Sequence, residues 1–461
     1  MSLLYDAVIV GGGPGGYPAA ILLGRKGFKV ALIEKNLLGG ECTNYGCVPT
    51  KALIHAAKIS NHLKGYDWVK GNIEEKAVFD WVKEIVSETR KGIMHLLEAS
   101  GVEIFHDEAL NINNNCVKLR SGKELCGQKG VLLALGSDPI LPKGFTVDGV
   151  RIHDNRSLLN IQEPPESILV VGAGYVGVEF SYALTGLGSD VYLVEILDRP
   201  LPQMDRDVGI LVRQVLSKQG VKQFFKTTVQ RIDIVSDKVK VSLLKHSEIL
   251  NISVSSVLFA TGRRPRHIKG LSNSGVMIDD KGFIKTDCRM RTSNPKIYAA
   301  GDVAGPPLLA HKAIVESIVA AENIVGNENC LKDPVIPQVV YIEPEIVEVS
   351  TGLDPVKEYE SVKIRTDALA RSRIERSPGF VKLVYEKDSG RIVKIILAYS
   401  NASESAGEAA RIIARRLTIW DLEDGIVHPH PTLSEALAEA YYYASGKHVH
   451  VIAGIKKKYK I

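Results

Sequence analysis

The sequence predicts an α/β protein with two Rossmann-like dinucleotide-binding domains and a C-terminal α+β domain. A glycine-rich turn between a strand-like run and a helix-like run occurs twice, each time followed by an acidic residue at the same spacing. Beyond residue 336, strand-like runs precede helices, as is typical of an α+β unit. The 461 residues suffice for about three domains, and a composition of 45% apolar and 24% charged residues excludes collagen-like and disordered chains.

The first glycine turn, Gly11 to Gly16, follows an apolar run and opens a helix rich in Ala, Leu and Ile. In a dinucleotide fold Gly11 makes the tight turn, Gly13 lets the pyrophosphate approach the backbone, and Gly16 lets helix and strand pack closely. The pyrophosphate then lies at the N-terminus of the helix. Glu34 follows Gly11 by 23 residues, a spacing typical of a carboxylate that binds ribose hydroxyls.

The second turn repeats this unit, with Gly172, Gly174 and Gly177 in the turn and Glu195 again 23 residues after the first glycine. An ordinary turn between strand and helix is the alternative interpretation of one such pattern. The matching acidic residue in both units favours two nucleotide sites. Because a carboxylate at Glu195 repels a 2′-phosphate, we expect the second site to prefer NAD over NADP.

Other periodic segments extend this architecture. Helices are expected over 51–100 and 404–416 and after Pro431, and strands over 131–135, 253–260, 297–300, 339–342, 380–385 and 392–398. Several prolines between the two glycine turns predict a domain boundary within 145–165.

Two of the six cysteines, Cys42 and Cys47, are close enough in sequence to share a site. In a regular helix their Cα atoms would lie too far apart for a disulfide, so a bridge requires distorted backbone, which Gly46 and Pro49 allow. We therefore interpret the pair as a working redox dithiol, with two unrelated buried thiols as the alternative. No metal site is expected, since zinc usually takes four ligands. The remaining four, Cys116, Cys126, Cys288 and Cys330, are expected to be buried core residues.

A redox dithiol needs a stabilised thiolate and an acid/base group. Lys51 and the start of the following helix are placed to stabilise a thiolate. His430 lies between two prolines, and an unperturbed imidazole pKa of ~6.5 suits proton exchange with thiols. Taken alone, His430 is more typical of a turn residue, and Thr432 with Glu435 is more typical of a helix capping box.

Charge and hydropathy limit the partners. The 58 basic and 53 acidic side chains leave a net charge of +5, spread along the chain, so nucleic-acid binding is not expected. We find no secretory signal and no apolar run near the ~18 residues of a membrane span, and therefore expect a cytoplasmic protein that does not bind membranes. The basic end, Lys456 to Lys460, is expected to be solvated and mobile.

These features occur in the order found in one known family. The residues that carry the resemblance are Gly11–Gly16 with Glu34, Gly39–Lys51, Gly172–Gly177 with Glu195, Ala260–Pro265, Ala300–Asp302 and His430–Glu435. The chain resembles the flavoprotein disulfide reductases over essentially its whole length. The resemblance implies an FAD-binding domain (1–149), an NAD-binding domain (150–270), a central domain that packs with the FAD domain (271–336) and a dimer-interface domain (337–461). It also implies a C2 homodimer with two composite sites.

The same resemblance implies which residues serve each role. FAD would be held by Gly11, Gly13, Gly16, Glu34, Lys51, Ala109, Gly136, Asp302, Leu309, Ala310 and His311, and NAD by Gly172, Gly174, Gly177, Glu195 and Gly262. The catalytic residues would be Cys42, Cys47, His430, Glu435, Lys51 and Glu179. Of these, Lys51 and Glu179 match the family's pair beside the flavin.

The chemistry implied by the resemblance is dithiol oxidation. His430, oriented by Glu435, would take a proton from a dihydrolipoyl thiol. The resulting thiolate would attack Cys42 and leave Cys47 as the thiolate next to FAD, from which electrons pass to NAD. The implied partner is the lipoyl-bearing protein of a 2-oxoacid dehydrogenase or glycine cleavage system. The alternatives are a reductase of another low-molecular-weight disulfide and a flavoprotein that acts mainly as a docking subunit of a 2-oxoacid dehydrogenase complex.

Three positions depart from the family pattern: Glu41 before the first cysteine, Leu135 at a strand end and Arg266 after the Arg-x-Pro motif. None of them removes a catalytic group. We expect Glu41 to raise the pKa of Cys42 by like-charge proximity. The departures therefore concern substrate preference more than reaction class.

Overall fold

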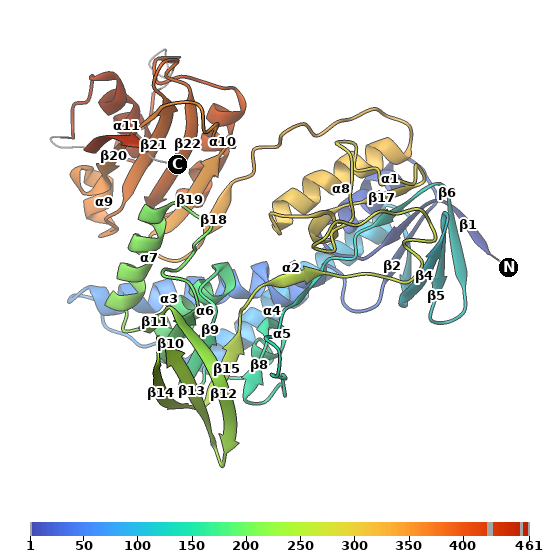
Figure 1. Ribbon diagram of the computed structural model, residues 1–461, viewed down its shortest axis with the longest axis horizontal. Coiled ribbons are helices and arrows are strands. Elements are labelled where there is room, and N and C mark those ends of the chain that lie inside the picture. Colours follow the sequence, from blue (N-terminus) through green and yellow to red (C-terminus); the bar gives the residue numbers. More distant parts are fainter. Residues whose placement is uncertain (1, 422–426, 452–454, 460–461) are drawn as a thin grey trace. The chain divides into compact units, whose positions relative to one another are not determined.

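The computed structural model describes residues 2–421, 427–451 and 455–459. The chain forms two compact units (Figure 1): unit 1 comprises 1–196 and 221–332, and unit 2 comprises 197–220 and 333–461. Segment 197–220, which the sequence assigned to the NAD-binding domain, groups with the C-terminal part of the chain. The four domain boundaries given by the resemblance remain predictions.

The first sheet of unit 1 is built around the first glycine turn. Its strand order is β3-β2-β1-β6-β5-β4, and β17 also pairs with β6. The strands are β1 (Leu3–Val10), β2 (Val30–Glu34), β3 (Glu103–His106), β4 (Ala109–Asn113), β5 (Cys116–Leu119), β6 (Glu124–Leu133) and β17 (Ile297–Ala299). Strand β2 is buried throughout, as expected for a parallel strand covered on both faces. Helices α1 (Tyr17–Arg25) and α8 (Ala310–Ile324) pack together beside this sheet (Figure 1).

The second sheet of unit 1 is parallel, with the order β11-β10-β9-β15-β8. Its strands are β8 (Ile152–His153), β9 (Ser167–Val171), β10 (Asp190–Glu195), β11 (Lys222–Phe225) and β15 (Ser256–Phe259); β12 (Thr227–Val235), β13 (Lys238–Lys245) and β14 (Glu248–Val254) form a separate antiparallel meander. The single strand predicted over 253–260 is therefore two strands in two sheets. The chain changes sheets at Ser255, which exchanges hydrogen bonds with Ser167 across 3.0 Å.

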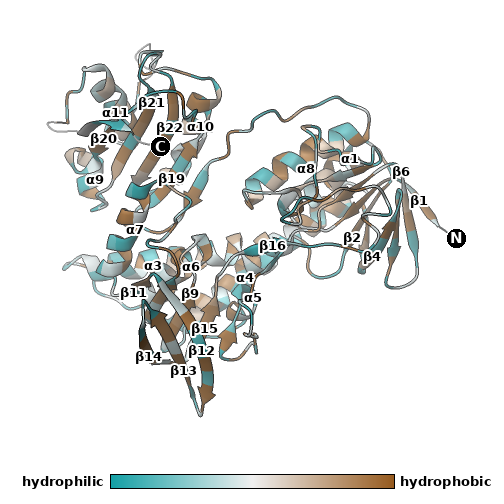
Figure 2. Cartoon of the chain, viewed as in Figure 1, coloured by the Kyte–Doolittle hydropathy of each residue, from teal (hydrophilic) through white to brown (hydrophobic). Residues whose placement is uncertain are grey.

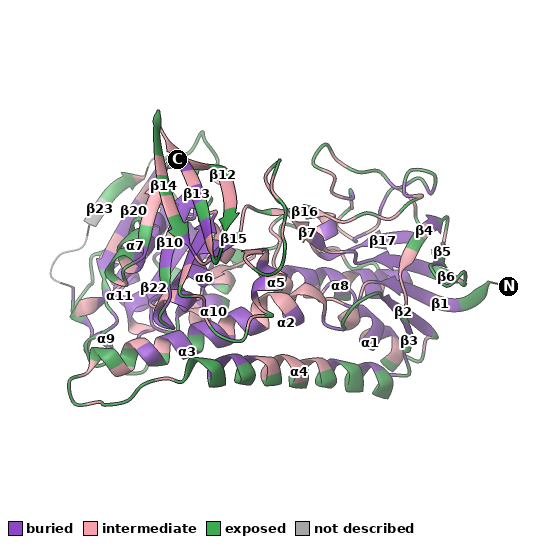
Figure 3. Ribbon diagram, turned by 90° about the horizontal axis from the view of Figure 1, so that it is seen from below, coloured by how far each residue is buried: buried purple, intermediate pink, exposed green. Residues whose placement is uncertain are grey.

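The helices of unit 1 place the segment that carries Cys42 and Cys47 against the second nucleotide fold, which is the fold built around the glycine turn Gly172–Gly177. The helix predicted over 51–100 is divided into α3 (Cys47–Gly65) and α4 (Glu75–Ala99), and Figure 3 shows α4 exposed along one side. Helix α3 packs on α6 (Tyr175–Gly186) so closely that a Cβ on Gly186 would lie 2.6 Å from the Ala57 Cβ. The smaller elements are α2 (Gly40–Tyr45), α5 (Asn155–Leu158), the 3₁₀ turn η1 (Gly301–Ala304) and the antiparallel pair β7 (Ser137–Pro139) and β16 (Arg263–Pro265).

Unit 2 has the predicted α+β character. Its antiparallel sheet has the order β18-β19-β22-β21-β20-β23. Its elements are β18 (Gln338–Val340), β19 (Glu345–Ser350), β20 (Tyr359–Arg365), β21 (Phe380–Glu386), β22 (Ile392–Tyr399), β23 (Ile455–Tyr459), α7 (Arg206–Lys218), α9 (Ala370–Ile374), α10 (Ala406–Ala414), α11 (Glu435–Ser445), η2 (Thr366–Ala368) and η3 (Ala402–Ser405). The central strands β21 and β22 are buried at every residue and largely apolar (Figure 2), so they form the core of this unit.

The basic C-terminal segment differs from the expectation of a mobile tail. Strand β23 pairs with β20 at the edge of the sheet. Lys458 forms an ion pair with Glu358 at 2.6 Å, and the Tyr459 hydroxyl donates a hydrogen bond to Asp205 at 2.9 Å. Paired backbone groups and these contacts hold the segment in place. Lys460, part of the same prediction, lies outside the described residues.

The four remaining cysteines also differ from the expectation, since they form two disulfides. Cys116 joins Cys126, and Cys288 joins Cys330. The first pair results from sheet register, because Cys116 on β5 lies directly opposite Cys126 on β6. The second pair joins residues 42 positions apart, a separation at which sequence spacing does not indicate contact.

Among the described residues, no helix has both the length and the apolar character needed to span a bilayer.

A buried ionic network ties segment 197–220 to the sheet of unit 2. The Lys382 ammonium donates to Asp205 and Asp207, each at 2.9 Å, and Lys394 pairs with Glu348 at 3.0 Å. The side chains of Lys382 and Asp205 are 9% and 3% exposed. Although burial opposes ionisation of Asp205, the hydrogen bond and charge of Lys382 hold its pKa below the usual range. A lowered folded pKa stabilises the fold above the unfolded pKa of about 4, and this stabilisation is lost as pH falls through the folded pKa.

We predict that Asp205→Asn lowers the free energy of unfolding by about 3 kcal/mol at pH 7, because it leaves a buried ammonium short of a counter-charge. The difference from the wild type should shrink as pH falls from about 4 towards the lowered folded pKa of Asp205, because the wild type loses this stabilisation there. Urea denaturation followed by circular dichroism at both pH values measures this. Asp190→Asn, which breaks a pair in which both side chains are 48% exposed, is the control and should cost about 0.5 kcal/mol or less. Equal losses in the two variants would contradict the prediction.

Candidate active site

The two cysteines lie on either side of a helix break. Cys42 is in the short helix α2, and Cys47 is the first residue of α3. Gly46 separates the helices with φ −139° and ψ −107°, a backbone conformation that glycine adopts readily. The predicted distortion is therefore present at Gly46. Both cysteines are free thiols and partly buried, as a working dithiol in its reduced form requires.

The pKa values of the two thiols are shifted in opposite directions. The hydrogen bond from the Cys42 thiol lowers the pKa of Cys47, and the nearby Lys51 ammonium lowers it further, against the effect of burial. The pKa of Cys42 is raised, because its thiol donates that hydrogen bond to Cys47 and is itself buried. The negative charge of the reduced pair therefore resides on Cys47, at the N-terminus of a 19-residue helix whose dipole also favours an anion.

Lys51 forms an ion pair that reaches between the two nucleotide folds of unit 1. Its ammonium lies 2.7 Å from the carboxylate of Glu179, which is 5% exposed. Lys51 is on α3, one helical turn after Cys47, and Glu179 is on α6, so the packing of α3 on α6 brings them together. The sequence proposed this pair by resemblance alone, since 128 residues separate its members.

The two glycine turns have equivalent geometry. A Cβ on Gly16 would lie 1.9 Å from the Gly11 carbonyl oxygen, and a Cβ on Gly177 would lie 1.8 Å from the Gly172 carbonyl oxygen. Only glycine is tolerated at such a close approach of helix and strand. No side chain caps the N-termini of α1 and α6, both of which belong to the described part of the chain. Each turn therefore presents an uncapped helix start that fits a pyrophosphate.

The acidic residue of each unit lies at its glycine turn. The Glu34 carboxylate accepts the Gly12 N–H at 2.7 Å, and the Glu195 carboxylate accepts the Ala173 N–H at 2.7 Å. Both carboxylates are at the carboxyl end of the second strand of their unit, where a ribose lies in a dinucleotide fold.

Two further segments contact the first turn. A Cβ on Gly13 would lie 3.6 Å from the Gly40 Cα, and a Cβ on Gly15 would lie 3.0 Å from the Ala300 carbonyl oxygen. The cysteine segment and the segment with Asp302 thus contact the same turn. Asp302 lies in η1, where it accepts a hydrogen bond from Ser137. The other predicted FAD-binding residues lie at the ends of elements: Ala109 at the start of β4, Gly136 before β7, Leu309 before α8, and Ala310 and His311 at the start of α8. Gly262, which was predicted to bind NAD, lies before β16.

His430 and Glu435 form a dyad in unit 2. The His430 Nδ1 lies 2.8 Å from Glu435 Oε1, and the other carboxylate oxygen accepts the Thr432 N–H at 2.7 Å. Although partial burial opposes ionisation, the Thr432 N–H and His430 hold the pKa of Glu435 below its usual range. The Thr432 hydroxyl binds the Pro429 carbonyl and Ser434, so the capping box is only half formed. Glu435 therefore orients the imidazole and supports the turn before α11 at the same time.

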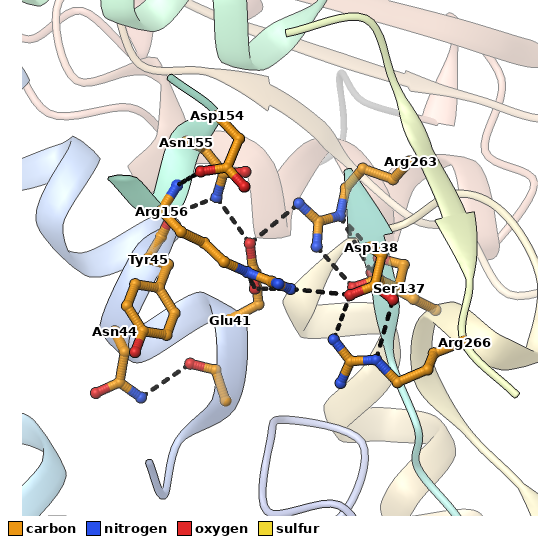
Figure 4. Close-up of polar contacts among 12 residues, drawn as sticks. Glu41, Asn44, Tyr45, Ser137, Asp138, Asp154, Asn155, Arg156, Arg263 and Arg266 are labelled. Carbon is orange, nitrogen blue, oxygen red and sulfur yellow. Dashed lines mark hydrogen bonds and ion pairs between the residues drawn. The ribbon is translucent and has the colours of Figure 1, made fainter. Parts of the chain in front are cut away.

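Glu41 belongs to a charged network that the sequence did not predict (Figure 4). Its carboxylate pairs with Arg156 at 2.8 Å and with Arg263 at 3.1 Å. No sequence pattern links Glu41 to Arg156 or Arg263, because each of them lies more than 100 positions away. The sequence showed only that Glu41 and Arg266 depart from the family pattern. The pKa of Cys42 is raised, which is the expected direction, but its main causes are the hydrogen bond to Cys47 and burial. The two guanidinium groups offset the Glu41 charge.

Two family models match the chain. Residues 5–317 match the pyridine nucleotide-disulphide oxidoreductase model, and residues 336–441 match the dimerisation domain of the same family. The chain belongs to the pyridine nucleotide-disulphide oxidoreductases. The predicted fold class and the resemblance to flavoprotein disulfide reductases are thereby confirmed.

Two proteins that are similar in sequence are both named dihydrolipoyl dehydrogenase. The chain is 36% identical to the dihydrolipoyl dehydrogenase of Thermus scotoductus, over 97% of this chain and 99% of that protein. It is 33% identical to the dihydrolipoyl dehydrogenase of Geobacillus stearothermophilus, over 97% of each.

Solved structures agree on the fold. The Cu(II) complex of the HOCl-induced flavoprotein disulfide reductase RclA from Escherichia coli has a TM-score of 0.86 and 26% identity, covering 96% of this chain and all of that one. LpdA from Mycobacterium tuberculosis also has a TM-score of 0.86, covering 95% of this chain and 99% of that one; at 23% identity it supports the fold alone.

We predict that Lys51→Met raises the pKa of Cys47 by about one unit, because it removes the ammonium that stabilises the thiolate. The rate of iodoacetamide alkylation of the reduced protein, measured against pH, reports this shift, and tandem mass spectrometry distinguishes Cys47 from Cys42. Lys64→Met, at the exposed far end of the same helix, should leave the profile unchanged. Identical profiles for Lys51→Met and the wild type would contradict a role for this ammonium.

Proposed function

We propose that this protein is a dihydrolipoyl dehydrogenase, which oxidises protein-bound dihydrolipoamide to lipoamide and reduces NAD⁺ to NADH. The observation that carries the proposal is the pair of free thiols whose charge is directed to Cys47 by Cys42 and Lys51. The 36% identity to a dihydrolipoyl dehydrogenase over nearly the whole chain supports the choice of substrate.

The residues present fit FAD at the first glycine turn and NAD at the second. Both turns have the close glycine approach and the uncapped helix start that a pyrophosphate requires. At the first turn, Glu34 would hold the ribose and Asp302 the ribityl chain. At the second turn, Glu195 would hold the adenosine ribose. When bound, FAD accepts an electron pair from the dithiol and passes it to NAD⁺ as hydride.

The acid/base role falls to His430. Because its Nδ1 faces Glu435, its Nε2 is the atom that takes a proton from the substrate thiol. The Glu435 carboxylate stabilises the imidazolium that results. In the proposed homodimer, each site combines Cys42 and Cys47 of one subunit with His430 of the partner subunit.

The cysteines then exchange bonds with the substrate, starting from the Cys42–Cys47 disulfide. The substrate thiolate attacks the Cys42 sulfur, and Cys47 leaves as a thiolate that Lys51 stabilises. The imidazolium of His430 gives its proton to solvent and then takes the proton of the second substrate thiol, whose sulfur displaces Cys42 and closes the cyclic disulfide of the product. Cys42 leaves as a thiolate and receives this second proton from His430. This leaves two unbonded cysteines, and the raised pKa of Cys42 keeps the proton on that sulfur.

A reductase of another low-molecular-weight disulfide is the second candidate. It is favoured by the 26% identity and the TM-score of 0.86 to the disulfide reductase RclA. A docking subunit without chemistry is disfavoured, because Cys42, Cys47, His430 and Glu435 are all retained. The proposed partner is a separate lipoyl-bearing protein of a 2-oxoacid dehydrogenase or glycine cleavage system. The proposed location is the cytoplasm, where the dithiol would contribute to redox homeostasis.

We predict that the purified flavoprotein reduces NAD⁺ with dihydrolipoamide, and that Cys47→Ser abolishes this turnover because no disulfide can form. His430→Gln should lower kcat by about 100-fold or more, because it removes the acid/base group. Absorbance of NADH at saturating substrates measures both. A protein that retains FAD but turns over another disulfide with NADPH, and not dihydrolipoamide, would instead establish the second candidate.

We further predict that kcat/KM is about tenfold or more higher for NAD⁺ than for NADP⁺, because the Glu195 carboxylate repels a 2′-phosphate. Glu195→Gln retains an acceptor for the Ala173 N–H and should reduce this preference. The ratio of the two kcat/KM values in each variant is the readout. An unchanged ratio would show that Glu195 does not select the nucleotide.

A further inference from the structure

The cysteine helix α2 is held at both ends by one short element of the second nucleotide fold. The Asn155 side-chain amide donates to Glu41 Oε1 at 2.7 Å and to the Tyr45 carbonyl at 2.8 Å (Figure 4). Glu41 comes directly before Cys42, and Tyr45 comes directly before Gly46 and Cys47. Asn155 therefore contacts α2 immediately outside the first cysteine and just before the backbone break. These contacts form a clamp, by which α5 holds the segment that carries Cys42 and Cys47.

Ion pairs also belong to this clamp. Arg156, next to Asn155, donates through Nε at 2.9 Å to Glu41 and pairs with Asp138 at 3.2 Å. Arg263 also pairs with Glu41, and its guanidinium donates to the Ser137 carbonyl at 2.9 Å. The clamp thus joins α2 to α5 and to both strands, β7 and β16, that connect the two nucleotide folds.

The network contains equal numbers of opposite charges. Its carboxylates are Glu41, Asp138 and Asp302, and its guanidinium groups are Arg156, Arg263 and Arg266. The Arg266 and Arg156 side chains lower the pKa of Asp138 to about 2 against the effect of burial, so that carboxylate stays ionised. Glu41, Arg156 and Arg263 are 25%, 30% and 18% exposed at the side chain, so water only partly screens them.

We propose that Glu41 is a positioning residue of the redox site: paired with Arg156 and Arg263, it fixes the cysteine helix through a charge-balanced clamp. The inference rests on the proposed redox role of Cys42 and Cys47. A carboxylate beside a reactive thiol would by itself disfavour the thiolate. The arginines remove that penalty while the hydrogen bonds keep α2 in place. Glu41 and Arg266, two of the three departures from the family pattern, belong to this one network.

The test changes the charge of the clamp and measures the apparent pKa of the thiols. Holoenzyme is reduced, freed of reductant without oxygen and alkylated with iodoacetamide at a series of pH values. Glu41→Gln leaves two guanidinium groups without part of their counter-charge, so it should lower the apparent thiol pKa by about 0.5 unit or more. Arg156→Gln should raise it by a similar amount. The double variant should return close to the wild type.

The other charged groups around the thiols are unchanged in these variants. The charged groups are Lys51 on α3 and Glu179 on α6, and Tyr17 on α1 is a neutral titratable group whose raised pKa reflects burial and the nearby Cys42. Asp190→Asn, which alters an exposed ion pair elsewhere in unit 1, is the matched control and should leave the thiol pKa unchanged. Should Glu41→Gln not fold, Arg156→Lys, which keeps the charge, should titrate as the wild type, whereas Arg156→Gln should not.

The outcomes separate this inference from the proposed function. A merely structural role would move both single variants in the same direction and make the double variant the most altered. That result, or no shift in either single variant, overturns the role of Glu41. Turnover of dihydrolipoamide by the same wild-type preparation tests the function independently. Shifts of opposite sign with restoration in the double variant establish the charge-balanced clamp.

Discussion

Gly46 lies between two helices, and its backbone break is the constraint on which the redox site depends. A continuous helix would hold Cys42 and Cys47 too far apart to form a bond and would leave Cys47 away from a helix start. The break makes Cys47 the first residue of α3, where the helix dipole and Lys51 favour its thiolate. Cys42, whose pKa is raised by its hydrogen bond to Cys47 and by burial, remains the protonated thiol of the pair.

The position of α3 is in turn fixed by packing. Because Gly186 has no side chain, α6 packs directly against Ala57 of α3. This close packing brings Glu179 to Lys51. The ammonium therefore has a fixed place beside the thiolate. The two nucleotide folds of unit 1 act as one scaffold for a site whose residues come from both, which suits electron transfer between two bound nucleotides.

Two ionic networks pair charged groups that are buried or partly buried in the described part of this protein. In unit 2, Lys382 and Lys394 lie among carboxylates and hold segment 197–220 on the sheet. In unit 1, three arginines surround Glu41 and Asp138 near the cysteines. Burial of unpaired charge would cost several kcal/mol per ion, so each network behaves as a unit in which the loss of one member exposes the others.

The sequence by itself determined the two nucleotide folds, the α+β C-terminal unit and the redox pair, because glycine turns, spaced acids and periodicity are local features that the backbone obeys directly. The His430 and Glu435 dyad was implied only by the family resemblance, because by themselves these residues are more typical of a turn and a helix cap. Only the tertiary structure decided which distant residues meet: the pairing of Cys288 with Cys330, the edge strand formed by the basic C-terminal segment, and the arginines around Glu41. The physical reason is that these contacts are set by sheet register and helix packing, which bring together side chains up to 222 positions apart without leaving a pattern in the chain.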